Sequence, residues 1–451
     1  EEFSMKVTLS GFNMEVHENP VRTPEVLTAA YARVSRSEKT LAQLREVARA
    51  NVEKARKSNE SIVYDMGHAS IAEHAFFNID IEDVSRLALE ELEKHRLASY
   101  TEKSQRYVKL DSDWHMPAEW VKNNQELTQL HTHAVAFYQD LLSAGVAAED
   151  ARYYLPLVVT GQVGLSCNAR SAEHMILRLA ASPFAEARQL AGLMFGVLKP
   201  VVPSLIRYVE PSAWILREEA AGWTLLATEE TRLEENVSFL GQPVGQLQLC
   251  SPVDDWDALV LAHQAVRAGA PYAAALAGAR QLSAEGRSEA FARITDGMSV
   301  HDPAPRPWEH VSLTWEWVLS AAAYAQLKRH RLAGITPAAY DPHLGFTHPA
   351  AAATDGFAAR ARDLVALSEA TASRVEGPAS VYALLSGHRR RLTWTANLRE
   401  TLHFSRLRED AHAQWDIRAF AGAVSAIVRE HAPHCGRIFG GKDAFAGKTL
   451  S

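Results

Sequence analysis

The chain contains few cysteines. Three occur in 451 residues, Cys167, Cys250 and Cys435, and they are odd in number and far apart in the sequence. This usage excludes a disulfide framework and a CxxC metal site, and it is typical of a protein in a reducing compartment. We therefore expect neither structural disulfides nor a metal centre.

Long apolar runs are also missing. No stretch reaches the roughly 20 residues of a membrane-spanning helix, and the N-terminus lacks the basic-then-apolar pattern of a signal peptide. A formal net charge of -7 argues against a surface that coats nucleic acid. At 451 residues the chain is long for a single domain. We expect a cytoplasmic protein with two or more cores and no membrane or nucleic-acid partner.

Against this acidic background, one stretch gathers cations and hydroxyls. It reads EKHRLASYTEKSQRYVKL at residues 93–110, with cations from Lys94 to Lys109, and KRHRLAGITPAAYDP echoes it at 328–342. The planar fork of arginine suits phosphate or the carbonyl edge of a pyrimidine. The alternative is a solvated helix end whose cations satisfy the last carbonyls. Because the stretch also holds a carboxylate, Glu102, and the Ser104 hydroxyl, it suits a nucleotide.

The echo extends to the flanking segments. EHAFFNIDI (73–81) and EHVSLTWEW (309–317) alternate apolar and polar residues, which predicts two half-buried strands. Each passes into a helical pattern that ends in His-Arg-Leu-Ala, at 95–98 and 330–333. Asn-x-Arg, with His four residues after the Arg, then occurs twice, at Asn168, Arg170 and His174 and at Asn397, Arg399 and His403. We infer a tandem duplication, with one half at 5–225 and the other at 226–451, and the seam inside 217–245.

Several of these segments resemble the flavin-dependent thymidylate synthase family. Its signature is Arg-His-Arg-x-x-Ser, a short gap, and Ser-x-Arg-Tyr. The first half matches in GHASIAEH (67–74), HRLASYTEKSQRY (95–107), ARYYLP (151–156) and NARS (168–171). The second half matches in EHVSLTWEW, QLKRHRLAG and TWTANLRETLHFSRLREDAHAQWDI (393–417). The resemblance implies an α/β (α+β) class, with two tandem copies that each pack a mixed or antiparallel sheet with long helices.

The resemblance also implies a reaction. FAD, reduced by NADPH, would support transfer of a methylene group from methylenetetrahydrofolate to C5 of dUMP. The family is a homotetramer, so two copies of this duplicated chain are expected to form a homodimer that is a pseudo-tetramer. No protein thiol attacks the uracil in this family, and none of the three cysteines lies in a nucleophile-like context. Instead, an arginine stabilises the negative charge that develops on the ring.

Family positions carry over to this sequence residue by residue. The implied catalytic residues are Arg408 and Ser104. The implied nucleotide contacts are Glu102, Ser104, Gln105, Arg106, Arg152, Gln326, Arg329 and Arg408. The implied cofactor contacts are Ser35, His68, Ser70, Glu73, Lys94, His95, Arg96, Asn168, Arg170, His174, Arg329, His330, Arg331, Asn397, Arg399, His403 and His412. Interhelical hydrogen bonds are the alternative role for the Asn-x-Arg residues, and a surface ion pair is the alternative for Arg408.

Each half has lost part of the family set. The first half has Glu91 and Lys94 in place of the family Gln and Arg, and its counterpart of Arg408, Arg178, aligns only with a gap. The second half has lost the loop: Pro337, Ala339 and Asp341 replace Glu, Ser and Arg, Val381 stands where the first half has Arg152, and Ala304 stands where it has His68. The losses are complementary. We therefore expect one composite site with residues from both halves and a second, inactive site.

Two other functions stay open. Lys94 and Thr101 stand where the family usually has Arg and Asn. These departures leave room for a related C5 hydroxymethylase or methylase of another pyrimidine nucleotide. A non-catalytic paralogue that binds flavin or a nucleotide is the third possibility.

Overall fold

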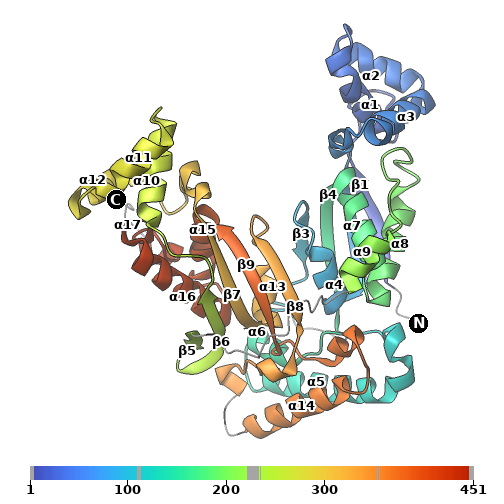
Figure 1. Cartoon of the computed structure of the whole chain (residues 1–451). Coiled ribbons are helices and arrows are strands. Elements are labelled where there is room, and N and C mark those ends of the chain that lie inside the picture. The colour runs from blue at the N-terminus through green and yellow to red at the C-terminus, as the bar shows by residue number, and fades with distance from the viewer. Residues whose placement is uncertain are drawn as a thin grey trace. The chain divides into compact units, whose positions relative to one another are not determined.

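A computed structural model describes residues 5–108, 113–220, 233, 235–352, 354 and 356–445. Lys109 and the predicted boundary at 225/226 lie outside these residues. The chain forms two compact units (Figure 1). The first unit consists of Glu1–Ala148, Leu155–Thr228 and Ala366–Leu384, and the second of Glu149–Tyr154, Glu229–Val365 and Leu385–Ser451.

The sheet of the first unit has the order β1-β2-β4-β3, and every neighbouring pair is antiparallel. Its strands are β1 (Lys6–Phe12), β2 (Phe76–Ser85), β3 (Ser99–Glu102) and β4 (Thr160–Asn168). The predicted alternation is confirmed, because Phe77, Ile79 and Ile81 are fully buried. The strand begins three residues later than predicted, because the Glu-His pair ends a short 3-10 helix, η3 (Ala69–His74).

The sheet of the second unit repeats this order with one added strand, as β5-β6-β7-β9-β8. Its strands are β5 (Glu235–Phe239), β6 (Gln242–Leu249), β7 (Ser312–Ser320), β8 (Gly334–Tyr340) and β9 (Arg389–Asn397), again all antiparallel. Leu313, Trp315 and Trp317 are buried as predicted. Here too the Glu-His pair ends a 3-10 helix, η6 (Arg306–His310), so β7 begins after it.

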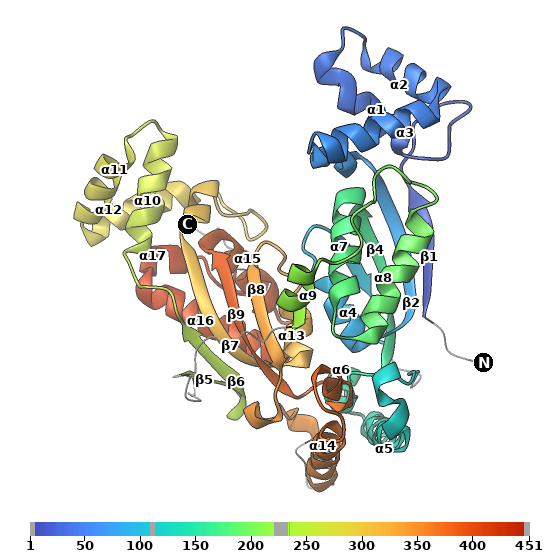
Figure 2. The same ribbon diagram turned by 45° about the vertical axis from the view of Figure 1, so that its right-hand side comes forward.

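Helices repeat in the same order. In the first unit, α4 (Arg86–Glu93), α7 (Ala169–Ala181) and α8 (Ala185–Leu198) contact the sheet, as Figure 2 shows. Their counterparts are α13 (Ala321–Leu327), α15 (Leu398–Arg408) and α16 (Trp415–His431). A serine caps the first helix of each set: Ser85 Oγ accepts the Ala88 N–H, and Ser320 Oγ accepts the Ala323 N–H. Such a cap ends the strand and starts the helix at one residue.

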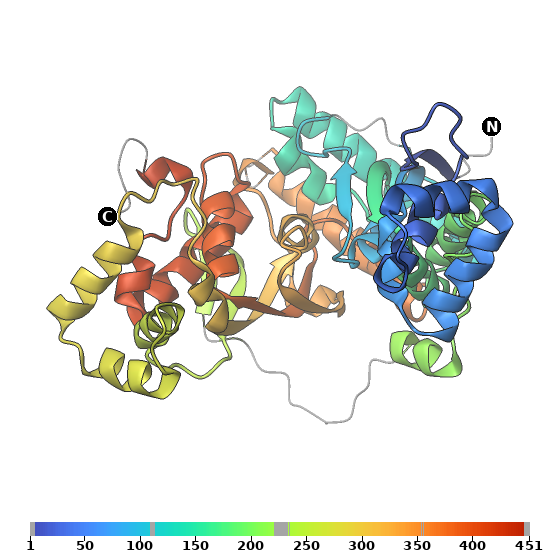
Figure 3. The same ribbon diagram turned by 90° about the horizontal axis from the view of Figure 1, so that it is seen from above.

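A three-helix group completes each unit. It consists of α1 (Glu25–Arg33), α2 (Leu41–Ala50) and α3 (Val52–Glu60) in the first unit. The second unit has α10 (Trp256–Arg267), α11 (Tyr272–Gln281) and α12 (Ala284–Thr295), which Figure 3 shows near the C-terminal helices. The remaining helices are α5 (Asn124–Ser143), α6 (Ala148–Ala151), α9 (Ala213–Ala220), α14 (Ala358–Ala372) and α17 (Pro433–Gly436). No helix in the described part of the chain is long and apolar enough to cross a bilayer.

The two halves of the sequence exchange short segments. Residues 149–154 come from the first half but belong to the second unit, and Ala366–Leu384 come from the second half but belong to the first unit. Before the exchanged segment, α5 ends at Ser143 and Gly145 follows with a φ of 85°. Because of the exchange, Arg152 folds with the C-terminal half of the chain.

Candidate active site

A buried amide links residues of both halves inside the second unit. Gln414 lies just before α16, and its Oε1 accepts a hydrogen bond from Nη2 of Arg152. The same oxygen accepts the Nε2–H of Gln326 at 3.2 Å. All three side chains are buried. Arg152 and Gln326, both predicted as nucleotide contacts, are therefore joined through Gln414, which was not among the predicted site residues.

Arg408 extends this network at the end of α15. Its Nη2 donates to the Gln326 carbonyl at 3.1 Å, and its Nε donates to Nε2 of His330 at 3.1 Å. On the other side of the ring, Nδ1 of His330 lies 3.1 Å from Oε1 of Glu400. An arginine Nε–H can only donate, so His330 Nε2 is the acceptor and Nδ1 carries the proton that bonds Glu400. The tautomer is thereby fixed.

Electrostatics keep this imidazole neutral. Burial, followed by the charges of Arg408 and His403, holds the pKa of His330 well below its ordinary value. Burial also raises the pKa of Glu400, although His403 and Arg399 oppose that shift. A neutral His330 holds the guanidinium of Arg408 in place without adding a second positive charge beside it.

The predicted nucleotide loop lies in the first unit. Glu102, at the end of β3, forms a buried ion pair with Arg86. Ser104 Oγ accepts the Arg106 N–H at 3.3 Å, which turns the chain. Burial alone would lower the pKa of Arg86, but the Glu102 carboxylate and two further glutamates of α4 raise it on balance. The Arg86–Glu102 ion pair and the Ser104–Arg106 hydrogen bond thus hold the loop in this conformation.

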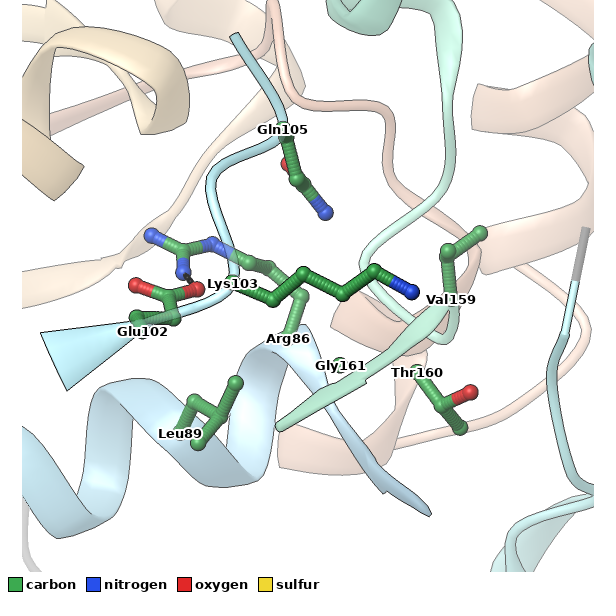
Figure 4. A pocket seen from close by; sticks show the side chains of 8 residues that line it. All are labelled: Arg86, Leu89, Glu102, Lys103, Gln105, Val159, Thr160 and Gly161. Carbon is green, nitrogen blue, oxygen red and sulfur yellow. Dashed lines mark hydrogen bonds and ion pairs between the residues drawn. The ribbon is translucent and has the colours of Figure 1, made fainter. Parts of the chain in front are cut away.

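A pocket lies beside this loop. Figure 4 shows the Arg86–Glu102 pair and the Lys103 side chain, which extends across the pocket toward Val159. The pocket is lined by Arg86, Leu89, Glu102, Lys103, Gln105, Val159, Thr160 and Gly161. A Cβ on Gly161 would meet Leu89 Cδ1 at 3.3 Å, so the missing side chain keeps this space open. Two predicted contacts, Glu102 and Gln105, line the pocket.

The matching space in the second unit is filled. Arg390 pairs with β7 at the register that Gly161 has with β2, and it is buried. Its guanidinium lies 4.8 Å from the Tyr324 ring and 4.3 Å from the Tyr340 ring, and its Nε donates to the Ala338 carbonyl at 2.7 Å. Arg390 therefore packs against the segment in which Pro337, Ala339 and Asp341 replace the family Glu, Ser and Arg.

The first-unit counterpart of the arginine network has its cations in ion pairs. Nζ of Lys94 lies 2.5 Å from Oε1 of Glu91, and Nη1 of Arg178 lies 2.6 Å from Glu218 and 3.2 Å from Glu219 of α9. Burial, with His174, Lys94 and Arg178 nearby, lowers the pKa of His95 to about 3. Lys94 and Arg178, which line a cavity together with His95 and His174, thus already have carboxylates as partners.

Residues predicted to contact the flavin form matched sets. Nη1 of Arg170 lies 2.6 Å from Glu73, and Nη1 of Arg399 lies 2.7 Å from Glu309. Edge-to-face rings join His95 to His174 at 5.5 Å and His330 to His403 at 5.7 Å. Ser35, His68, Ser70, Arg96, Arg329, Arg331 and His412 are exposed, and His412 Nδ1 lies 2.7 Å from Asp410 Oδ1. Exposed guanidinium and imidazole donors of this kind can bind phosphate groups.

Asn168 and Asn397 have a local role that the sequence reading did not consider. Asn168 Oδ1 accepts the Ser171 N–H at 2.8 Å, and Asn397 Oδ1 accepts the Glu400 N–H at 2.9 Å. Both are N-caps, of α7 and α15. Asparagine followed by a helical pattern was the available signal. Gln414 lies in the family-like sequence Ala-Gln-Trp, but no sequence feature indicated that it contacts Arg152.

Both halves of the chain are similar to known proteins. The model of a family described as "Thymidylate synthase complementing protein" matches twice, at residues 18–204 and 254–434, which confirms the tandem copies. The flavin-dependent thymidylate synthase of Sulfurisphaera tokodaii is 33% identical over 181 residues, which are 39% of this chain and 70% of that protein. The enzyme of the same name from Geobacter sulfurreducens is 33% identical over 196 residues, covering 42% of this chain and 83% of that protein.

A solved structure, the UMP/dUMP methylase PolB from Streptomyces cacaoi bound with 5-Br dUMP, aligns with a TM-score of 0.38 and 19% identity. The alignment covers 45% of this chain and 93% of that one.

Proposed function

The chain belongs to the thymidylate synthase complementing protein family, and from this premise we propose that it is a flavin-dependent thymidylate synthase. In this proposal it methylates dUMP at C5 with methylenetetrahydrofolate and NADPH. When bound, FAD would supply the hydride that reduces the transferred one-carbon unit. The observation that carries the proposal is the contact chain from Arg152 through Gln414 and Gln326 to Arg408, because it unites residues that the two halves kept separately.

The network has parts suited to a uracil nucleotide. The Arg152 guanidinium would bind the nucleotide anion, and Arg408 would stabilise negative charge on the pyrimidine ring as C5 becomes nucleophilic. Gln326 Oε1 is buried and has no hydrogen-bond partner among the described residues. A small rotation of this amide would offer it to a ring N–H. The role of the Glu102–Ser104–Arg106 loop in the same reaction stays a prediction from the sequence.

We propose one active nucleotide site per chain. The second unit's counterpart of the loop pocket is filled by Arg390, and the first unit's counterpart of Arg408 is paired with Glu218 and Glu219. In the second unit the loop pocket is therefore filled, and in the first unit Arg178 is paired with two glutamates at the wall of a cavity of about 240 Å³. Two chains would form a homodimer, which light scattering can test. Calorimetric titration with dUMP should saturate at one nucleotide per chain.

The reaction can be tested directly. Purified protein should be yellow and should release FAD on denaturation, which excludes a scaffold that binds no flavin. Tritium should be released from C5-labelled dUMP only when both methylenetetrahydrofolate and NADPH are present. Release from labelled dCMP instead of dUMP would favour the related C5 methylase or hydroxymethylase. Flavin binding without release from either nucleotide would favour a non-catalytic paralogue and contradict the proposal.

A further inference from the structure

Residues 414–416, from the second half of the sequence, each form a hydrogen bond with the exchanged segment 149–154. Gln414 Nε2 donates to the Glu149 carbonyl at 2.7 Å, beside the bond that its Oε1 accepts from Arg152. The indole N–H of Trp415 donates to Asp150 Oδ1 at 2.7 Å. Three consecutive residues, 414–416, thus contact this segment, and we call them the clamp.

The third clamp residue makes the most deeply buried contact. The Tyr153 hydroxyl donates to Oδ2 of Asp416, and both side chains are buried. The same carboxylate oxygen accepts the hydroxyl of Ser320, the N-cap of α13, at 3.0 Å. The Tyr153 ring stacks on Trp415 with centroids 5.5 Å apart. Asp416 therefore fixes Tyr153 relative to α13, the helix that carries Gln326.

Arg152 is the direct neighbour of Tyr153 in the chain. Its backbone is fixed on one side by the Tyr153–Asp416 bond and on the other by the Gln414–Glu149 bond. Its guanidinium is oriented by Gln414, which also holds Gln326. A buried network with several satisfied members restricts a long side chain far more than one contact does.

The first unit contains a matched arrangement without the arginine. There the Tyr382 hydroxyl donates to Glu186 Oε2 at 2.9 Å, and the N-cap Ser85 donates to the same oxygen at 2.5 Å. Tyr382 lies in the segment that the second half contributes, and its neighbour is Val381. Both units thus anchor the exchanged segment through a hydrogen bond from a tyrosine to a carboxylate. The residue before that tyrosine is Arg152 in the second unit and Val381 in the first.

We propose that the clamp 414–416 positions Arg152 for the nucleotide, with Tyr153 and Asp416 acting through Arg152 rather than touching the substrate. This inference rests on the proposed function, because the nucleotide is the ligand that Arg152 meets. It predicts that loosening the clamp weakens nucleotide binding. The chemical step depends on Arg408 and is expected to change little.

The test compares Tyr153→Phe with Tyr382→Phe, since each removes one hydroxyl from a buried carboxylate. For each flavin-loaded variant, the dUMP Kd is measured by calorimetry, along with KM, kcat, FAD content and melting temperature. We expect Tyr153→Phe to raise the dUMP Kd and KM about tenfold, with kcat within about twofold, a change typical of one lost buried hydrogen bond. Tyr382→Phe should lower the melting temperature similarly but leave the Kd within about twofold.

A double-mutant cycle separates positioning from a general structural effect. In an Arg152→Ala background, adding Tyr153→Phe should change the dUMP Kd less than about twofold. An equal loss with and without Arg152, or equal effects of Tyr153→Phe and Tyr382→Phe on the Kd, would overturn the inference. If Tyr153→Phe does not fold, Trp415→Phe serves in its place, because it removes the bond to Asp150 and reduces the ring that stacks on Tyr153. Wild-type protein that binds no dUMP would instead refute the proposed function itself.

Discussion

Gly161 in β4 and Arg390 in β9 occupy the same register position in the two sheets, yet one leaves a pocket open and the other fills it. Leu89 and Glu102 line the open pocket, and Tyr324 and Tyr340 flank the guanidinium in the filled one. The two copies have therefore diverged into an open pocket and a packed core. Their duplication still shows in strand order and helix caps.

Removing the Arg390 side chain should destabilise the protein without affecting turnover. Arg390→Ala deletes two cation–π contacts and a hydrogen bond to the Ala338 carbonyl, and it leaves a cavity. We expect a loss of about 2 kcal/mol in the free energy of unfolding, measured by urea denaturation. The control is Arg391→Ala, which removes a partly exposed ion pair with Glu316 and should cost about 1 kcal/mol or less. A larger loss for the control would argue against the filled pocket.

Replacing the two cap asparagines tests whether they act on the helix or on the flavin. Asn168→Ala and Asn397→Ala should each cost about 1 kcal/mol of unfolding free energy, because each leaves a helix N-terminus uncapped. Serine is an equally good cap, so Asn168→Ser and Asn397→Ser should keep near-normal stability. FAD content, measured by absorbance after denaturation, should stay normal in the serine variants. Serine variants that are stable but lose FAD would show a direct flavin contact.

Stability should fall on mild acidification because of His95. The folded-state pKa of this residue is lowered to about 3, mainly by burial, so the unfolded chain binds a proton near the ordinary histidine pKa while the folded chain does not. Above about pH 6.5 His95 is neutral in both states and does not affect the free energy of unfolding. Below this pH the free energy of unfolding falls by about 1.4 kcal/mol per pH unit, because only the unfolded chain binds the proton. Denaturation of wild type and His95→Gln between pH 7.5 and 5 measures the difference. Parallel curves for the two proteins would contradict this expectation.

Local patterns predicted much of the fold. Alternation placed β2 and β7, and the repeated motifs predicted two similar halves, which the family match confirms. The strand starts were wrong by about three residues, because a 3-10 turn with a Glu-His pair has no period that distinguishes it from an extended segment. The burial of all of α4, including its glutamates, was not predicted either.

The exchanged segments could not have been predicted from one sequence. The bond between Arg152 and Gln414 joins residues 262 positions apart, and residues 149–154 are too few to show any periodicity. Complementary losses in the two halves predicted that Arg152 and Arg408 serve one site, but not that Gln414 connects Arg152 to Gln326. The pairing of Arg178 with α9 was equally invisible, because the acidic residues lie 40 and 41 positions away.

The most direct measurement is tritium release from C5-labelled dUMP by wild type, Arg408→Ala and Arg178→Ala. Arg408 lies in the network with Gln326 and His330, whereas Arg178 is paired with Glu218 and Glu219. We expect Arg408→Ala to lose at least about 100-fold in kcat, the scale of one lost charge-stabilising group. Arg178→Ala should keep most of the wild-type rate, with FAD content normal in both variants. Equal losses in the two variants would contradict the division between one active and one inactive site.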